Sequence, residues 1–105
     1  MKKTIRVMIK EPGEVPYMKE IPNELHAMQE IVGGLIETFQ IANNVTIICD
    51  EEGKLKDKPF SFVWGRVLFV GTCIFCGVDG AEFTDFPYKK VEDFYLDIHK
   101  MRMMT

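Results

Sequence analysis

The chain has 105 residues, of which 47% are hydrophobic and 28% are charged, the composition of one ordinary globular domain. Its net charge of -3 argues against nucleic acid as a partner, because phosphate binding needs clustered Lys and Arg. The longest apolar run, 67–78, is shorter than the roughly 20 residues of a membrane helix, and the first residues do not resemble a signal peptide. With an odd number of cysteines as well, we expect a cytoplasmic protein with free thiols and no membrane association.

Two extended segments open the chain. Residues 4–10 alternate between apolar and polar side chains, which indicates a half-buried strand. After a turn rich in Pro and Gly, residues 15–21 resume an extended pattern. Val15 and Tyr17 are expected to face inward, with Ile21 as a third candidate. Two prolines in this second strand cannot donate ladder hydrogen bonds, so we place it at a sheet edge. The two segments are predicted to form a hairpin.

A short amphipathic helix is predicted next. Asn23 suits its N-cap, and the pair Gly33-Gly34 ends it, because glycine accepts the left-handed conformation at a helix C-terminus. The apolar stripe of this helix is expected to contain Leu25, Met28, Ile31 and Val32.

A second hairpin follows the helix. Residues 35–41 and 45–49 read as its strands, with a tight turn at Asn43-Asn44, because asparagine tolerates positive φ. Segment 54–65, interrupted by Pro59, is expected to be a loop or helical turn that covers one end of the core.

The C-terminal part contains the longest apolar run and the longest helix pattern. Residues 66–78 are predicted to form a central strand that bends at Gly71. A final helix is expected to begin after Thr84 or Asp85, with Pro87 in its first turn. Its apolar face is expected to contain Val91, Phe94, Tyr95, Ile98 and Met101.

These elements predict one α+β domain over residues 1–105. We expect an antiparallel or mixed sheet of about five strands, with two helices packed on the same face of it.

Cys73-x-x-Cys76 is the one motif that has a named chemistry. In a strand, two residues at this spacing point to opposite faces and lie about 10 Å apart, beyond the roughly 7 Å that a disulfide spans. We interpret both as buried packing residues, with a redox or metal-binding pair as the alternative. His26 and His99 lie far apart in the sequence, so neither a metal site nor a cofactor is expected, and no catalytic set is evident.

The aromatic and basic group Phe60, Phe62, Trp64 and Arg66 is the candidate binding site. Trp and Arg are enriched where proteins bind one another, so this group fits a partner-binding edge. The alternative is that these side chains pack in the core. The proline-containing edge strand also leaves room for a homodimer.

Several short motifs together resemble one known family. They are Glu11-Pro12-Gly13, the helix end at 25–34, Ile36-Glu37, the run 48–55, Val70-Gly71-Thr72, and Gly80 with Glu82-Phe83-Thr84. On these residues the chain resembles the domain of unknown function 3846, a family of phages and other mobile elements. The resemblance implies an α+β fold and gives no functional residues. The chain lacks the Asn-Arg pair that relatives often carry near residues 57–62, a place that Arg66 could fill.

Three functional hypotheses follow. The first is a non-enzymatic binding module of phage or mobile-element origin that acts through protein contacts, as an inhibitor or accessory factor of host machinery. The alternative is a small-ligand or nucleotide-signal binding protein that uses Trp64 and Arg66. The third is a thiol-dependent enzyme.

Overall fold

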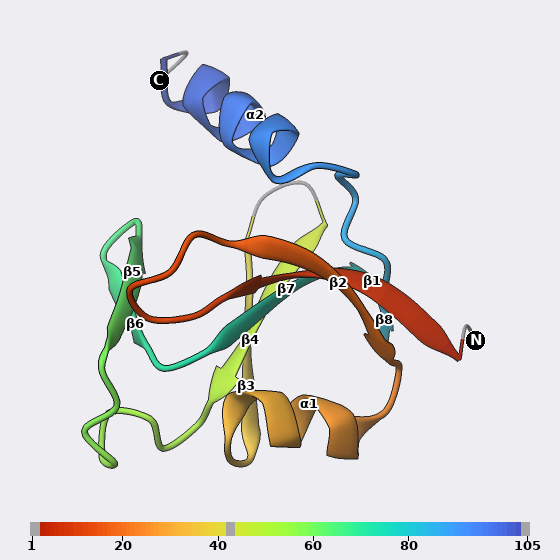
Figure 1. Cartoon of the computed structure of the whole chain (residues 1–105). Coiled ribbons are helices and arrows are strands. Elements are labelled where there is room, and N and C mark those ends of the chain that lie inside the picture. Colours follow the sequence, from red (N-terminus) through yellow and green to blue (C-terminus); the bar gives the residue numbers. More distant parts are fainter. Residues whose placement is uncertain (1–2, 42–43, 104–105) are drawn as a thin grey trace.

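The computed structural model describes residues 3–41 and 44–103, which form a single α+β domain (Figure 1). In chain order the elements are β1 (Thr4–Lys10), β2 (Tyr17–Pro22), α1 (Leu25–Val32), β3 (Ile36–Gln40), β4 (Val45–Asp50), β5 (Phe60–Trp64), β6 (Val67–Val70), β7 (Cys73–Asp79), β8 (Glu82–Thr84) and α2 (Val91–Met103). The α+β prediction is confirmed, although these strands outnumber the five expected.

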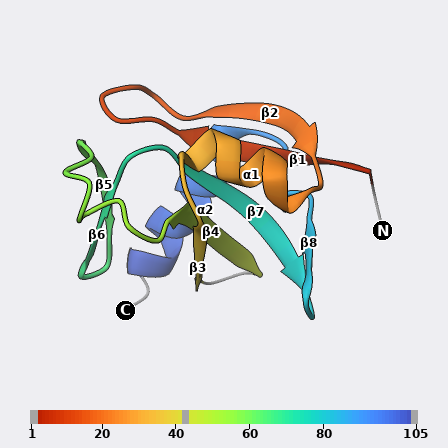
Figure 2. The same ribbon diagram turned by 90° about the horizontal axis from the view of Figure 1, so that it is seen from below.

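A six-stranded antiparallel sheet forms the centre of the fold. Its strands run in the order β2-β1-β7-β4-β3, and the short β8 pairs with the end of β7. Hairpin β5–β6 forms a separate two-stranded sheet, which Figures 1 and 2 show at one side of the molecule. The extra strands have three origins: segment 60–64, expected to be a loop, pairs with β6, the predicted strand 66–78 is divided into β6 and β7, and β8 pairs with β7.

The two helices cover opposite faces of the sheet, which corrects the expectation that they share one face. Met28 and Val32 of α1 pack in one buried cluster, whereas Phe94 of α2 packs in a second. Figure 1 shows α1 below the sheet and α2 above it. The physical reason is that β4 is buried along its whole length, so both faces of the sheet need cover.

The central strand is β7, which lies between β1 and β4. The chain bends just before it at Gly71, whose φ is +73°, so the run 66–78 is two strands that meet at a corner. Cys73 and Cys76 are both buried in β7, and they belong to the clusters on opposite faces. The interpretation of these cysteines as packing residues is therefore confirmed.

The N-terminal hairpin and the edge position of β2 are confirmed, and of the three residues predicted to face inward only Ile21 does so. Val15 is 82% exposed and Tyr17 is 38% exposed, whereas Ile21 is buried. Ile21 packs against α1, which follows β2 directly in the chain, while Val15 and Tyr17 lie at the other end, beside the β1–β2 turn.

Both predicted helix starts differ from the structure. Glu24 occupies the N-cap of α1, and the Asn23 side chain donates instead to the carbonyl of Phe83. Helix α2 begins at Val91, because residues 85 and 86 are still bound to β1: the Asp85 carboxylate accepts the Arg6 amide at 2.8 Å, and the Phe86 amide donates to the Arg6 carbonyl at 2.7 Å.

The structure also bears on the predicted end of α1, on two residues of the predicted apolar helix faces and on the Asn43-Asn44 turn. Gly33 ends α1 in the left-handed conformation, with φ of +83°, as expected. Leu25 is 57% exposed and Tyr95 is 47% exposed, so neither belongs to a buried stripe. Asn44 has φ of +57°, whereas Asn43 and the Met101 side chain lie outside the described residues.

Candidate functional site

The predicted binding residues all lie on hairpin β5–β6 but do not form one surface. Phe62 stacks on Phe69 with ring centroids 4.7 Å apart, and Trp64 stacks on Phe94 of α2 at 5.9 Å. Phe62 and Trp64 thus attach the hairpin to the core. By contrast, Phe60 is 55% exposed, and Arg66 is exposed in the turn between the two strands.

An irregularity in β5 separates Phe60 from the two core aromatics. Phe60 pairs with Val70 and Phe62 pairs with Phe69, so Ser61 is an extra residue in the ladder, and it is buried. Such a bulge reverses the side-chain alternation of a strand. Strict alternation would place Phe60 and Phe62 on the same face of β5, and the bulge is the reason that they diverge.

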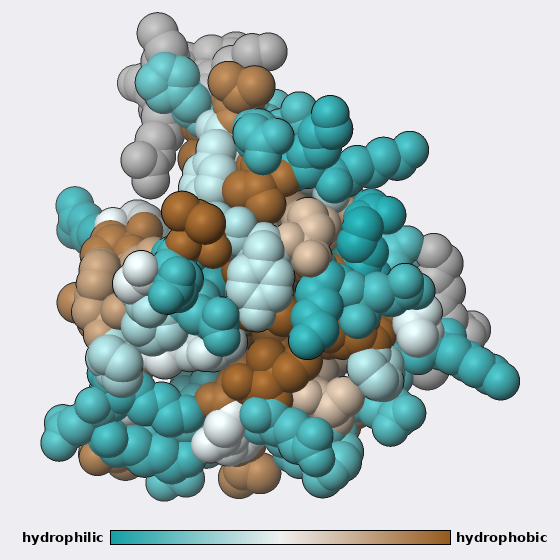
Figure 3. Space-filling model, in the orientation of Figure 1, coloured by the Kyte–Doolittle hydropathy of each residue, from teal (hydrophilic) through white to brown (hydrophobic). Residues whose placement is uncertain are grey.

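The outer side of the hairpin carries exposed apolar side chains. Val63 is 51% exposed, and its cross-strand partner Leu68 is 44% exposed. We call the set Phe60, Val63 and Leu68 the hairpin apolar face. Figure 3 shows hydrophobic side chains gathered at the left of the molecule, over β5–β6. Leu68 was not singled out in the sequence, because exposure cannot be read from a continuous apolar run.

A pocket of about 180 Å³ adjoins this face. One side is β6, whose residues 67–70 all line it, and the other sides are the edge strand β3, the end of β4 and loop 51–55. Apolar side chains of Phe39, Leu55, Leu68 and Val70 form much of the lining. Leu55 is 84% exposed and lines the same pocket as Leu68 of the hairpin apolar face.

Charged side chains surround one end of the pocket. Glu37 on β3, with Glu51 and Lys54 on the loop, are exposed, and Asp50 lies at the end of β4. Cys49 also lines the pocket. Burial raises the pKa of the Cys49 thiol to about 11, and the negative charges of Glu37 and Asp50 add to this effect. This thiol is therefore protonated at neutral pH.

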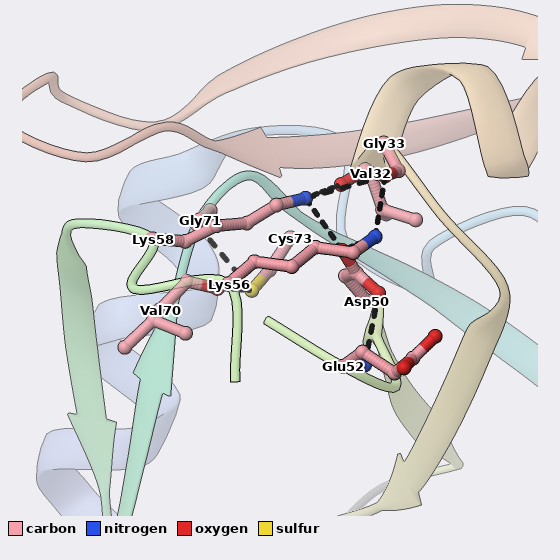
Figure 4. Close-up of polar contacts among 9 residues, drawn as sticks. All are labelled: Val32, Gly33, Asp50, Glu52, Lys56, Lys58, Val70, Gly71 and Cys73. Atoms are coloured by element: carbon pink, nitrogen blue, oxygen red, sulfur yellow. Dashed lines mark hydrogen bonds and ion pairs between the residues drawn. The ribbon is translucent and has the colours of Figure 1, made fainter. Parts of the chain in front are cut away.

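Asp50 is the buried centre of a polar network that holds the pocket loop in place (Figure 4). Its side chain is only 1% exposed, and its Oδ2 lies 2.6 Å from Lys58 Nζ and 2.9 Å from Lys56 Nζ. Its Oδ1 accepts the amide of Glu52 at 2.9 Å. Burial alone raises the pKa of Asp50, but these hydrogen bonds outweigh burial and lower the pKa to about 2.

The same two lysines bind the C-terminal end of α1. Lys58 Nζ donates to the carbonyl of Val32 at 2.6 Å, and Lys56 Nζ donates to that of Gly33 at 3.2 Å. Cations are favourable there, because the last carbonyls of a helix lack partners and carry negative partial charge. The network thus connects α1, β4 and loop 51–58.

Glycines make room for this network. A Cβ on Gly34 would lie 2.5 Å from Asp50 Oδ1, and one on Gly71 would lie 2.9 Å from Lys58 Cδ. The Gly33-Gly34 pair, the run 48–55 and Gly71 are separate in the sequence, yet they meet here. Sequence reasoning assigned these glycines only to a helix end and a strand bend, so it missed the network.

A second depression, of about 410 Å³, lies near the start of β1. Its lining is Lys3, Thr4, Arg6, Glu20 and Asp85, without an apolar residue. Small-molecule pockets are mostly apolar with a few polar groups, so this depression is a weaker candidate than the pocket beside β6.

Fold and site together define a small α+β domain, with an antiparallel sheet between two helices and a hairpin that borders an apolar pocket. The model of the domain of unknown function 3846 matches residues 5–99, and the chain belongs to this family. No curated protein and no solved structure gives a significant match. In the part of the chain that the structure describes, neither helix has the length and apolarity to cross a membrane.

Proposed function

We propose that this protein is a non-enzymatic, cytoplasmic binding module of phage or mobile-element origin. It binds a host protein through the hairpin apolar face and the adjacent pocket, and it acts as an inhibitor or accessory factor of host machinery. Phage or mobile-element origin rests on the resemblance to the family.

The observation that carries the proposal is the group of exposed apolar side chains on hairpin β5–β6 and beside its pocket, Phe60, Val63, Leu68 and Leu55. Each of these side chains is between 44% and 84% exposed, and two of them line the pocket. Exposed apolar surface of this kind, bordered by polar residues, is typical of protein interaction sites. Phe62 and Trp64 support the surface from the core, and Arg66 lies at its edge, where a partner could contact it.

Two further observations favour protein binding over the other hypotheses. The pocket, at about 180 Å³, is smaller than the roughly 300–1,000 Å³ of typical small-ligand pockets. Burial raises the pKa of Cys73 and of Cys76 to about 12, which suppresses the thiolate that a thiol-dependent enzyme requires.

Site-specific photo-crosslinking in the natural host tests this proposal. We expect a photoreactive residue at Leu68 or Phe60 to crosslink to a host protein, and one at the exposed Lys19 on β2 to give no such product. Leu68→Asp should abolish the product at Phe60 while preserving the fold, because Leu68 is 44% exposed. Crosslinks from Lys19 that equal those from Leu68 would contradict the proposed surface.

A further inference from the structure

Strand β6 has an open edge beside the pocket, and the binding role assigned to that edge below rests on the proposed function. In the described part of the chain, β6 pairs only with β5. In an antiparallel strand, every second residue directs its N–H and C=O toward the opposite edge. The other edge of β6 therefore presents main-chain groups that a further strand could pair with, and all four residues of β6 line the pocket at that edge.

The edge of β6 differs from the outer edges of the main sheet. Edge strand β2 carries Lys19, Glu20 and Pro22, and edge strand β3 exposes Glu37, Thr38 and Gln40. Charges and prolines of this kind discourage the pairing of another chain. Residues 67–70, by contrast, are Val-Leu-Phe-Val and carry no such residue. Of these three edges, the edge of β6 is therefore the best suited to accept a strand. The remaining edge of the small sheet, on β5, is interrupted by the bulge at Ser61.

The size of the pocket indicates how much of a partner it receives. A cavity of about 150 Å³ holds a benzene ring, so a pocket of about 180 Å³ has room for one large apolar side chain. A peptide that runs along β6 could insert one such side chain between Leu55 and Leu68, while its neighbouring side chains point to solvent.

The charged residues at the pocket indicate which residue type the bound peptide should carry near its inserted side chain. The Asp50 carboxylate is already paired with two lysines, whereas Glu37 and Glu51 are exposed and have no ion-pair partner among the described residues. Among the residues that line the pocket, the carboxylates of Glu37, Asp50 and Glu51 outnumber the single Lys54, and the two lysines that pair with Asp50 bind the end of α1 and do not line the pocket. This excess of negative charge in the lining favours a Lys or Arg in the bound segment.

We propose that the partner is recognised through an extended segment that adds as a strand to the free edge of β6. The segment inserts one Leu-sized or Phe-sized side chain into the pocket and places a Lys or Arg near Glu37 and Glu51. Main-chain hydrogen bonds supply affinity in this mode of recognition, and the pocket supplies specificity.

The test is selection from a displayed library of random peptides of about eight residues, long enough to extend beyond β6. We expect enriched peptides to share an apolar residue with a nearby Lys or Arg, and to be free of proline at the paired positions. The double variant Glu37→Lys with Glu51→Lys should bind these peptides about tenfold more weakly. The matched control, Glu14→Lys with Glu82→Lys, makes the same charge change at exposed sites elsewhere and should bind normally.

Amide hydrogen exchange of the complex distinguishes a strand from other bound forms. Strand addition slows exchange of amides within residues 67–70, whereas a peptide bound as a helix leaves them unchanged. Strand addition is wrong if no peptide is enriched, if binding ignores the charge reversal, or if the β6 amides are unaffected. If strand addition fails in this way but a photoreactive residue at Leu68 still crosslinks to a host protein, the proposed binding surface is retained and only the strand mode is wrong. If that crosslink is also absent, both the binding surface and the strand mode are wrong.

Discussion

Asp50 shows how one buried carboxylate can organise distant parts of a chain. It holds two lysines from loop 51–58, and those lysines in turn bind the carbonyls at the end of α1. Removal of a buried charge partner is costly, because the remaining charges lose their compensation. Replacement of Asp50 therefore tests whether loop 51–58 depends on this network for its position.

We expect Asp50→Asn to lower the free energy of unfolding by about 2 kcal/mol at pH 6, because the pKa of Asp50 is lowered from 3.8 to about 2. A lowered pKa stabilises the folded state above the unfolded pKa, and this stabilisation is lost as the pH falls through the folded value. The difference between wild type and variant should therefore shrink from pH 5 to pH 2, as measured by urea denaturation.

Asp57→Asn is the matched control for that measurement. Asp57 lies in the same loop but is exposed, so the same chemical change should alter stability by less than about 0.5 kcal/mol at every pH. A difference between Asp50→Asn and wild type that stays constant down to pH 2 would contradict the assigned role of the carboxylate.

Gly34→Ala, like Asp50→Asn, should weaken the dependence of the free energy of unfolding on pH between pH 5 and pH 2. The new Cβ would lie 2.5 Å from Asp50 Oδ1, so the carboxylate has to move away from its lysines. We expect a loss of about 2 kcal/mol, and an effect in combination with Asp50→Asn that is smaller than the sum. Gly13→Ala serves for comparison, because Gly13 has φ of +74° and open space around it. It should lower stability while leaving the dependence on pH intact.

At the scale of elements, α2 is attached to the rest of the molecule mainly by aromatic packing. Phe94 is 1% exposed and contacts Trp64, Phe75, Phe86 and Tyr88. The same cluster fixes hairpin β5–β6, because Trp64 belongs to β5. Damage to this cluster should therefore affect helix and hairpin together.

Phe94→Ala should reduce the free energy of unfolding by about 3–5 kcal/mol, because it leaves a cavity among these rings. It should also shift the emission of Trp64, the single tryptophan, to longer wavelength as water reaches the indole. Leu96→Ala, on the exposed side of the same helix, should change neither property, since Leu96 is 59% exposed. An unchanged Trp64 spectrum in Phe94→Ala would show that the hairpin is fixed independently of α2.

Sequence patterns predicted the elements that obey a simple period. Strand β1, the fully buried β4 and the glycine-ended α1 were all predicted close to their observed bounds. The bulge at Ser61 and the start of α2 could not be predicted in this way. The first breaks the period of two, and the second is delayed by the bonds of Asp85 and Phe86 to Arg6, far away in the sequence.

At the scale of the whole molecule, the three cysteines report on global unfolding. Cys73 and Cys76 are fully buried on opposite faces of β7, and Cys49 is 7% exposed in the pocket. We expect a thiol reagent at pH 8 to label all three at least about 100-fold more slowly in the native protein than in urea, because burial raises each thiol pKa to about 11 or 12. Among the three, Cys49 should react first.

Mass spectrometry of the labelled protein over time gives the measurement, and the urea-denatured protein is the reference. Rapid labelling of Cys73 and Cys76 together in native buffer would restore the hypothesis of a redox pair. Labelling of Cys76 at the rate of global unfolding would establish that its segment opens only with the whole domain.

The arrangement of the candidate site could not be predicted from the sequence, because it depends on segments that are far apart in the chain. The aromatic residues at 60–64 were singled out as a candidate binding group, but the segment was expected to be a loop and instead forms strand β5. Sequence alone could not say which of these aromatic side chains faces the core. That depends on the bulge and on α2, which arrives from the end of the chain to stack Phe94 on Trp64. The pocket likewise needs β3, β6 and loop 51–55 to meet, and no local pattern encodes this meeting.

The attachment of loop 51–58 to Asp50 has a consequence for the proposed recognition. Because the pKa of Asp50 is about 2, the lysine contacts persist across every pH from mildly acidic to neutral. Leu55 and the other loop residues that line the pocket are then held in position before anything binds, so little conformational freedom is lost on association. Such a preformed surface should bind its partner equally well in mildly acidic and in neutral solution.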